Sequence, residues 1–124
     1  MDELAQRAVA CKHWRWMSRM VDTTGRTFIS YADCGEAAWL WVAEDGCEWL
    51  PVEGRLPDLT DPATLGCLLA LVREAWGCDG LTCQPLLTEG GVHGWLVYMD
   101  ANRRTREIAA TEAEALVAAL EAAP

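Results

Sequence analysis

The chain has 124 residues, enough for one domain with one hydrophobic core. Hydrophobic residues make up 52% and charged residues 23%, a composition that excludes intrinsic disorder. The formal net charge of −9 argues against binding to nucleic acid or to anionic membranes. No apolar run approaches the ~20 residues of a membrane-spanning helix, and the first residues lack a signal-peptide pattern. We therefore expect a single cytoplasmic domain over residues 1–124 and no membrane partner.

The charged residues are unevenly distributed along the chain. Residues 33–61 carry eight acids and a single base, Arg55, whereas residues 1–30 carry five bases and three acids. Six cysteines would fit a disulfide framework in a secreted protein, but without a secretion signal they indicate reduced thiols. The acidic segment is therefore the most distinctive part of the charge pattern.

The first predicted elements are a short helix and a meander of three strands. Asp2 is the expected cap of the helix, and the apolar residues that follow it recur at helical spacing. Short runs rich in β-branched and aromatic residues then predict strands. The helix is expected over residues 3–11, the strands over 27–31, 38–43 and 47–50, and a hairpin turn at 44–46.

A second helix is predicted over residues 62–76. Asp61 is a suitable N-cap, Pro62 fits the first helical position, and Gly77 can adopt the left-handed conformation that ends a helix. The apolar residues of this segment recur at helical spacing and predict one buried stripe. They are Leu65, Leu68, Leu69, Val72 and Trp76.

A second meander is predicted after this helix. Its strands are expected over residues 81–87, 92–99 and 104–109, with turns at 89–91 and 100–102. Proline cannot donate a ladder hydrogen bond, so Pro85 predicts an irregular strand or an edge strand. Four charged residues load the last strand, as expected at a protected edge: Arg103, Arg104, Arg106 and Glu107.

A third helix is predicted over residues 112–122. Thr111 and Glu114 form the T-x-x-E pattern of a capping box at its start. Ala113, Leu116, Val117 and Leu120 recur at helical spacing and predict its buried face.

Two of the strands are apolar on both faces. In the segment 92–99, Trp95 and Val97 point one way while Leu96 and Tyr98 point the other. A strand that is apolar on both faces is covered on both faces. The sequence therefore predicts an α+β fold with a largely antiparallel sheet and helices on both faces, an α/β/α sandwich in the order α-β-β-β-α-β-β-β-α.

Several segments in this order are similar to a known family. A helix runs into the Trp-containing segment VACKHWRWM at 9–17, and PDLTD at 57–61 opens a helix that ends in Trp76. A WLVY strand at 95–98 and the helix start TEAEAL at 111–116 follow. This order resembles the phage ABA (alpha-beta-alpha) sandwich domain family, small proteins of unknown function encoded by phages and prophages. The resemblance covers most of the chain apart from residues 30–55. It implies a fold and a mobile-element origin, and it brings no catalytic residues.

A zinc site is one candidate for chemistry. Cys11, His13, Cys78 and Cys83 supply four ligands of the types that tetrahedral zinc takes. The C-x2-C spacing of a zinc knuckle is absent, however, and cysteine is readily buried in protein cores. We therefore expect no metal and no cofactor, with these four residues as the candidates if a metal is bound.

An enzyme is the next candidate class. Nucleophilic catalysis would need a cysteine or serine beside a base, and the only histidines are His13 and His93. The sequence contains no nucleophile elbow, no P-loop and no G-x-G-x-x-G pattern. We therefore expect no catalytic site.

The acidic meander is the candidate interaction surface. Three of its residues are tryptophans and three are acids near the predicted turn, so it could dock on a basic partner through charge and aromatic anchors. The alternative is a solvated acidic face that keeps the protein soluble. The candidate residues are Trp39, Trp41, Glu44, Asp45, Glu48 and Trp49.

A basic and aromatic stretch spans residues 12–19. Alternating bases and tryptophans are typical of a surface that binds single-stranded nucleic acid. The net charge of −9 opposes phosphate contacts, and Trp14 and Trp16 can instead alternate into the core. The core interpretation is favoured.

These observations favour a protein that binds rather than catalyses. We expect a phage or prophage accessory protein that acts as a non-enzymatic interaction module on a host or phage protein, with a homodimer through an exposed sheet edge or a Trp-bearing face as a further possibility. The first alternative is an acidic, nucleic-acid-mimicking inhibitor of a host nucleic-acid-binding or defence protein. The second is a small zinc-binding protein.

Overall fold

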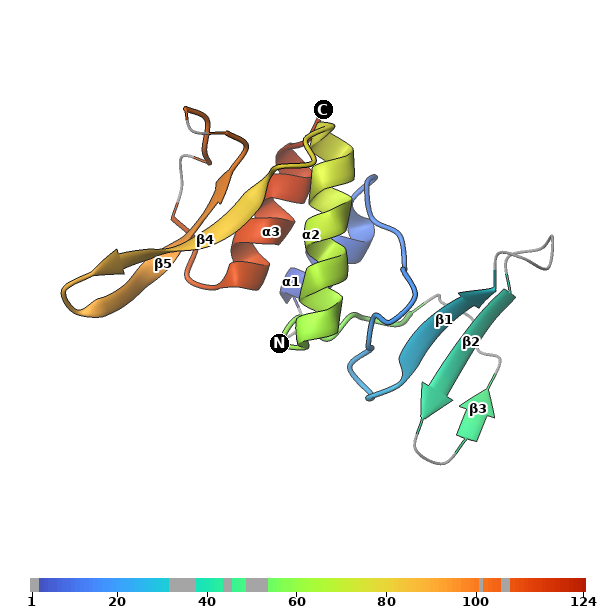
Figure 1. Cartoon of the computed structure of the whole chain (residues 1–124). Helices are drawn as coiled ribbons and strands as arrows, with labels where there is room; N and C mark the ends of the chain where they lie inside the picture. The colour runs from blue at the N-terminus through green and yellow to red at the C-terminus, as the bar shows by residue number, and fades with distance from the viewer. Residues whose placement is uncertain (1–2, 32–37, 44–45, 49–53, 101, 106–107) are drawn as a thin grey trace.

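The fold combines three helices and five strands in the part of the chain that the structure describes. The structure is a computed structural model, and it describes residues 3–31, 38–43, 46–48, 54–100, 102–105 and 108–124 (Figure 1). The predicted α+β class is confirmed. The helices are α1 (Glu3–Ala10), α2 (Pro62–Trp76) and α3 (Glu112–Ala122); the strands are β1 (Thr27–Tyr31), β2 (Ala38–Ala43), β3 (Gly46–Glu48), β4 (Thr82–Thr88) and β5 (Gly91–Tyr98).

The ends of α2 and α3 lie where the capping residues predict. The carboxylate of Asp61 accepts a hydrogen bond from the amide of Thr64 at 2.8 Å, and Gly77 ends α2 with φ 61°. The hydroxyl of Thr111 accepts from the amide of Glu114 at 3.1 Å. Both predicted helices are confirmed. The predicted cap of α1, Asp2, lies outside the described residues.

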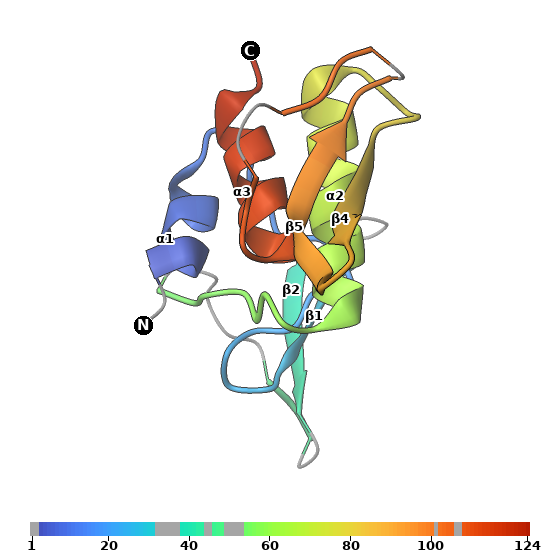
Figure 2. The ribbon, with the colours of Figure 1, turned by 90° about the vertical axis from the view of Figure 1, so that its left-hand side faces the viewer.

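The core forms where the three helices meet. They lie side by side with α3 in the middle (Figure 2). Burying each large aliphatic side chain contributes about 1.5–3 kcal/mol, so these contacts are the main source of stability. The fully buried members from α2 and α3 are Leu68, Leu71, Val72, Leu116, Val117 and Leu120.

Polar contacts tie the outer helices to α3. The indole Nε1 of Trp76, the last residue of α2, donates to the carbonyl of Ala119 at 2.8 Å. The guanidinium of Arg7 in α1 forms an ion pair with Glu121 in α3, and that hydrogen bond raises the pKa of Arg7. Both outer helices are therefore attached near the C-terminal half of α3.

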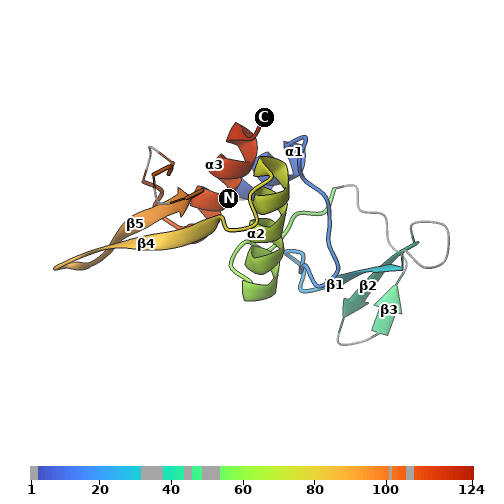
Figure 3. The same cartoon turned by 45° about the horizontal axis from the view of Figure 1, so that its top comes forward.

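The described strands form two sheets. β1, β2 and β3 make the predicted antiparallel meander, and β4 pairs with β5 alone among the described strands. The two sheets lie on opposite sides of the helices (Figures 1 and 3). The described strands therefore do not form the predicted single sheet with helices on both faces.

The reason lies in how β5 covers its two apolar faces. Val97 packs into the helical core and is fully buried. On the other face Gly94 is covered by Ile108, and a Cβ at Gly94 would lie 2.1 Å from the Ile108 Cγ2 atom. An apolar strand face needs a cover, but here the second cover is a chain segment without regular structure.

That segment replaces most of the predicted sixth strand. We call residues 99–109 the return arm; residues 101, 106 and 107 lie outside the described part of the chain. The arm runs back along β5 and pairs with it at two isolated points, Tyr98 with Arg104 and Trp95 with Ala109. In place of the charged edge strand expected at 104–109, the described residues form two isolated bridges with β5.

The strand β4 is irregular and lies at an edge, as Pro85 predicts. The pairing of β4 with β5 shifts register between Leu86 and Leu87, and no other described strand pairs with β4. Of the turn predicted at 100–102, residue 101 lies outside the described residues, and the carboxylate of Asp100 accepts a hydrogen bond from the amide of Asn102 at 2.8 Å. The turn predicted at 44–46 involves Glu44 and Asp45, which lie outside the described residues.

Candidate binding groove

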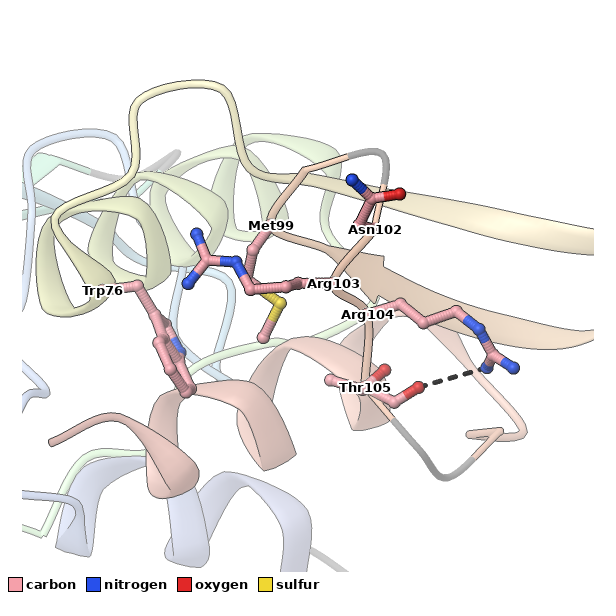
Figure 4. Close-up of a pocket in the computed structure, with 6 residues that line it drawn as sticks. All are labelled: Trp76, Met99, Asn102, Arg103, Arg104 and Thr105. Atoms are coloured by element: carbon pink, nitrogen blue, oxygen red, sulfur yellow. Dashed lines mark hydrogen bonds between the residues drawn. The ribbon is translucent and has the colours of Figure 1, made fainter.

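A groove lies between α3, the end of α2 and the return arm. Two adjoining hollows, of about 530 and 620 Å³, share four lining residues and so form one extended depression. Figure 4 shows the first hollow, which lies at the end of α2. The shared residues are Trp76, Met99, Arg104 and Thr105.

The side of the groove on α3 consists of small side chains and one acid, Glu114. Ala115, Ala118 and Ala122 line it, and their spacing places them on one face of the helix. Ala118 and Ala122 are exposed, whereas Ala115 is buried. Methyl side chains leave space beside the helix that larger residues would fill.

The opposite wall is the return arm, which is hydrogen-bonded to β5 at Thr105 and at Ala109. The amide of Thr105 donates to the carbonyl of Val97 at 2.8 Å, and its hydroxyl accepts from the amide of Val97 at 3.1 Å. Trp95 and Ala109 exchange two backbone hydrogen bonds, at 2.8 and 3.0 Å. Among the described residues of the wall, Thr105 and Ala109 are therefore fixed to β5 by hydrogen bonds, although they do not belong to a regular strand.

Trp76 and Met99 form the apolar end of the first hollow. The hydrogen bond from the Trp76 indole to α3 fixes the orientation of the ring. Figure 4 shows Trp76, Met99 and Arg103 directed toward the same space, while Arg104 points away from Trp76. An aromatic ring, a thioether and a guanidinium are the side chains most enriched at protein interfaces.

The arginines of the arm carry the charge of the groove. The Nε of Arg103 donates to Asp100 at 2.7 Å, and this hydrogen bond lowers the pKa of Asp100. The guanidinium of Arg104 donates to the carbonyl of Thr105 at 3.3 Å, and no described carboxylate pairs with it. The side chains that line the first hollow therefore include two cations and no acid.

The predicted interaction residues lie on the other side of the helices. Trp39 and Trp41 belong to β2, and Glu48 ends β3 in register with Trp41. The other three candidates, Glu44, Asp45 and Trp49, lie outside the described residues. The structure thus places three of the six candidates on neighbouring strands.

Two acids of the segment 33–61 have local structural roles. Asp58 accepts hydrogen bonds from the amide and hydroxyl of Thr60, at 3.0 and 2.6 Å, and Asp61 caps α2. The one base of the segment, Arg55, pairs with the buried Asp22 at 2.7 Å. Part of the acidic pattern therefore serves the fold.

The four candidate zinc ligands do not form a ligand group. Across the described residues there is no cluster of three or more histidine, cysteine or acidic side chains that could hold a metal ion. The thiol of Cys11 and the ring of His13 face carbonyls near the end of α3, at 3.6 and 3.4 Å. The thiol of Cys78 instead faces the carbonyl of Met99 at 3.1 Å, and burial raises the pKa of Cys83 to about 12.

The basic and aromatic stretch packs against the core, as the favoured interpretation predicts. Trp14 and Trp16 are half-buried and meet edge to face, with ring centroids 5.5 Å apart. Arg15 forms an exposed ion pair with Glu74 at 2.6 Å. His93, the other candidate base, is exposed on β5.

Sequence reasoning missed the groove because four separate segments build it. The one local signal was the pair Arg103 and Arg104 directly after the apolar strand end at Met99, which we interpreted as edge protection. Comparisons with known proteins add no family, since no family model, curated protein or solved structure matches the chain. Among the described helices, none has the length and apolar character to cross a membrane.

Proposed function

We propose that this protein is a non-enzymatic interaction module, a phage or prophage accessory protein that binds a host or phage protein through the groove. The observation that carries the proposal is the composition of the groove: Trp76, Met99 and two arginines around a row of alanines. A partner segment could place an apolar side chain over the alanines and exclude water from the tryptophan.

A second observation supports a protein partner. The three large apolar side chains that are exposed in the described residues belong to β4, β5 and the return arm: Leu87 at 69%, Val92 at 59% and Ile108 at 46%. Ile108 also lines the groove. Exposed apolar side chains grouped in one region are typical of interaction sites.

The test is selection from a displayed library of random peptides. Ala118→Trp fills the groove from an exposed helix position, so we expect this variant to retain none of the peptides that the wild type selects. Ala63→Trp, at an exposed position of α2 away from the groove, is the matched control and should bind as the wild type does. A wild type that selects no peptides, or peptides that bind Ala118→Trp equally well, would falsify the proposal.

The two alternative functions rest on the sequence alone. Charge mimicry needs the acids of residues 33–61 to be free for a partner, and Asp58 and Asp61 are already hydrogen-bonded within the fold. A pull-down with a basic partner protein at low and high salt tests that alternative. Metal analysis of the purified protein tests the zinc alternative.

A further inference from the structure

We propose that the partner segment is an acidic peptide, in which a bulky apolar side chain lies over Ala118 and a neighbouring side-chain carboxylate is bound by Arg103, with Arg104 adding a second positive charge on the same arm. This inference rests on the proposed function and specifies the chemistry of the occupant. It follows from the positions of the Arg103 and Arg104 guanidinium groups and from those of their N–H donors that have no acceptor among the described residues.

Arg103 is the residue placed to bind the carboxylate. Its Nε is occupied by Asp100, while no described group accepts a hydrogen bond from its two Nη nitrogens. Figure 4 shows the guanidinium on the side of the hollow where Trp76 lies. A guanidinium held at Nε by one carboxylate can still donate to a second from its Nη atoms, because the group has five N–H donors in a plane.

Arg104 adds positive charge without sharing the carboxylate that Arg103 binds, because its guanidinium points away from Trp76 (Figure 4). It lines both hollows, and its one hydrogen bond in the described structure is the 3.3 Å contact with the carbonyl of Thr105. An exposed guanidinium without a carboxylate partner gains more from an incoming carboxylate than one that must first leave a partner. A ligand that crosses from one hollow to the other passes this residue.

The rest of the groove limits the occupant to a short apolar segment. The alanines of α3 and the side chain of Ile108 offer aliphatic contact, and Arg7 is already paired with Glu121. The second hollow holds the acid Glu114 besides Arg7 and Arg104, so its charges largely offset one another, while the first hollow holds two cations and no acid. The matching ligand carries its apolar group and its acid side by side.

A polynucleotide could bind the two arginines of the groove, but the net negative charge of the whole chain would repel it. A net charge of −9 repels a long polyanion along its whole length. A single carboxylate senses chiefly the charges within about 8 Å at physiological ionic strength. The aliphatic lining also offers no second aromatic ring for base stacking beside Trp76. An acidic peptide is the better match.

The experiment uses three matched sets of short, fluorescently labelled peptides with blocked termini. Each peptide has one fixed leucine or phenylalanine, next to which stands glutamate in the first set, glutamine in the second and lysine in the third. Fluorescence polarisation with the full chain measures the affinities. We expect the glutamate set to bind about tenfold more tightly than the glutamine set, since hydrogen bonds between two charged groups are stronger than those with a neutral amide.

Two charge variants test which residues bind the acidic side chain of the peptide. Arg103→Gln with Arg104→Gln should abolish the preference for glutamate over glutamine. Arg103→Glu with Arg104→Glu should reverse the preference toward the lysine set. The matched control, Lys12→Glu with Arg15→Glu, makes the same charge change at exposed positions away from the groove and should keep the preference.

The outcomes separate this inference from the proposed function. If all three sets bind equally and Ala118→Trp blocks them, the groove binds apolar peptides and the acidic preference is wrong. If no set binds the wild type, the proposed function itself fails. If a single-stranded oligonucleotide displaces the glutamate set and loses affinity in the arginine variants, the occupant is nucleic acid and the inference is overturned. Circular dichroism confirms that each variant is folded.

Discussion

Pro85 lies opposite Trp95 in the β4–β5 ladder, at a pair where the two backbones do not hydrogen-bond to each other. Trp95 uses both its N–H and its carbonyl on Ala109, so both groups point away from β4. The alternation of an antiparallel ladder then places the nitrogen of Pro85 on the outer edge of β4. Because a proline nitrogen carries no hydrogen, this edge lacks a donor that a docking strand would need.

The first prediction concerns this edge. Pro85→Val restores the missing donor, and we expect the variant to self-associate more strongly than the wild type in light scattering at high protein concentration. The control is Gln84→Val, which adds similar apolar surface where the backbone pairs inward with Leu96. Equal association of both variants would indicate a surface effect and not an edge effect. A wild-type homodimer through the outer edge of β4 would have to form without the hydrogen bond that Pro85 cannot donate.

The second prediction concerns the wall of the groove. Gly94→Ala places a methyl group where Ile108 and the carbonyl of Ala109 now lie, at 2.1 and 2.9 Å. We expect a loss of about 2 kcal/mol in the free energy of unfolding, measured by urea denaturation, and weaker peptide binding because the arm is displaced. Gly90→Ala is the control, since its Cβ would meet only the hydroxyl of Thr88 at 3.9 Å. A Gly94→Ala protein with unchanged stability would mean that the arm does not pack against β5 as described.

The third prediction concerns the buried Asp22. Burial acts to raise its pKa, but hydrogen bonds from Thr24, the amide of Arg26 and the guanidinium of Arg55 outweigh that effect and lower it. A carboxylate with a lowered folded-state pKa stabilises the fold fully above its unfolded pKa of about 4, and this contribution is lost as the pH falls through the folded value. Asp22→Asn should therefore cost about 3 kcal/mol at neutral pH and progressively less in acid.

Urea unfolding of the wild type and of Asp22→Asn at several pH values checks this expectation. The other carboxylates titrate in both proteins, so the difference between the two curves isolates Asp22. If the difference in the free energy of unfolding stays constant between neutral pH and pH values below the folded pKa, the charge of Asp22 is not what stabilises the fold.

The fourth prediction concerns the Cys83 thiol. Burial raises its pKa to about 12, and the thiolate is the reactive form. On the order of one thiol in ten thousand is then ionised at pH 8. We expect Cys83 to resist iodoacetamide in the native protein and to react readily in urea, with mass spectrometry of the tryptic peptides as the readout. Labelling in the presence of EDTA excludes protection by a bound metal, and equal rates in buffer and urea would contradict the prediction.

The helix ends could be predicted from the sequence because local chemistry determines them. Asp61 and Thr111 accept hydrogen bonds from amides three residues later, and Gly77 adopts a backbone conformation that most residues avoid. Each of these interactions lies within one helical turn. The edge position of β4 was predictable for the same reason, since Pro85 cannot donate a ladder hydrogen bond.

The sheet arrangement was not predictable in the same way. The apolar pattern around Leu96 shows that both faces of β5 need a cover, but it does not say whether the cover is a helix or a loop. The actual cover of Gly94 depends on Ile108, fourteen residues further along the chain. The groove has the same origin, since Trp76 and Ala118 come together only through the packing of α2 on α3.

The central place of α3 also affects how the protein folds during synthesis. This helix follows every other element along the chain, yet it contacts α1, α2 and the β4–β5 sheet. A ribosome-bound chain that stops before residue 112 would hold α2 with its apolar stripe exposed and no helix to cover it. We therefore expect folding to begin only after α3 has left the exit tunnel, which makes the nascent chain a natural client of chaperones that bind apolar segments.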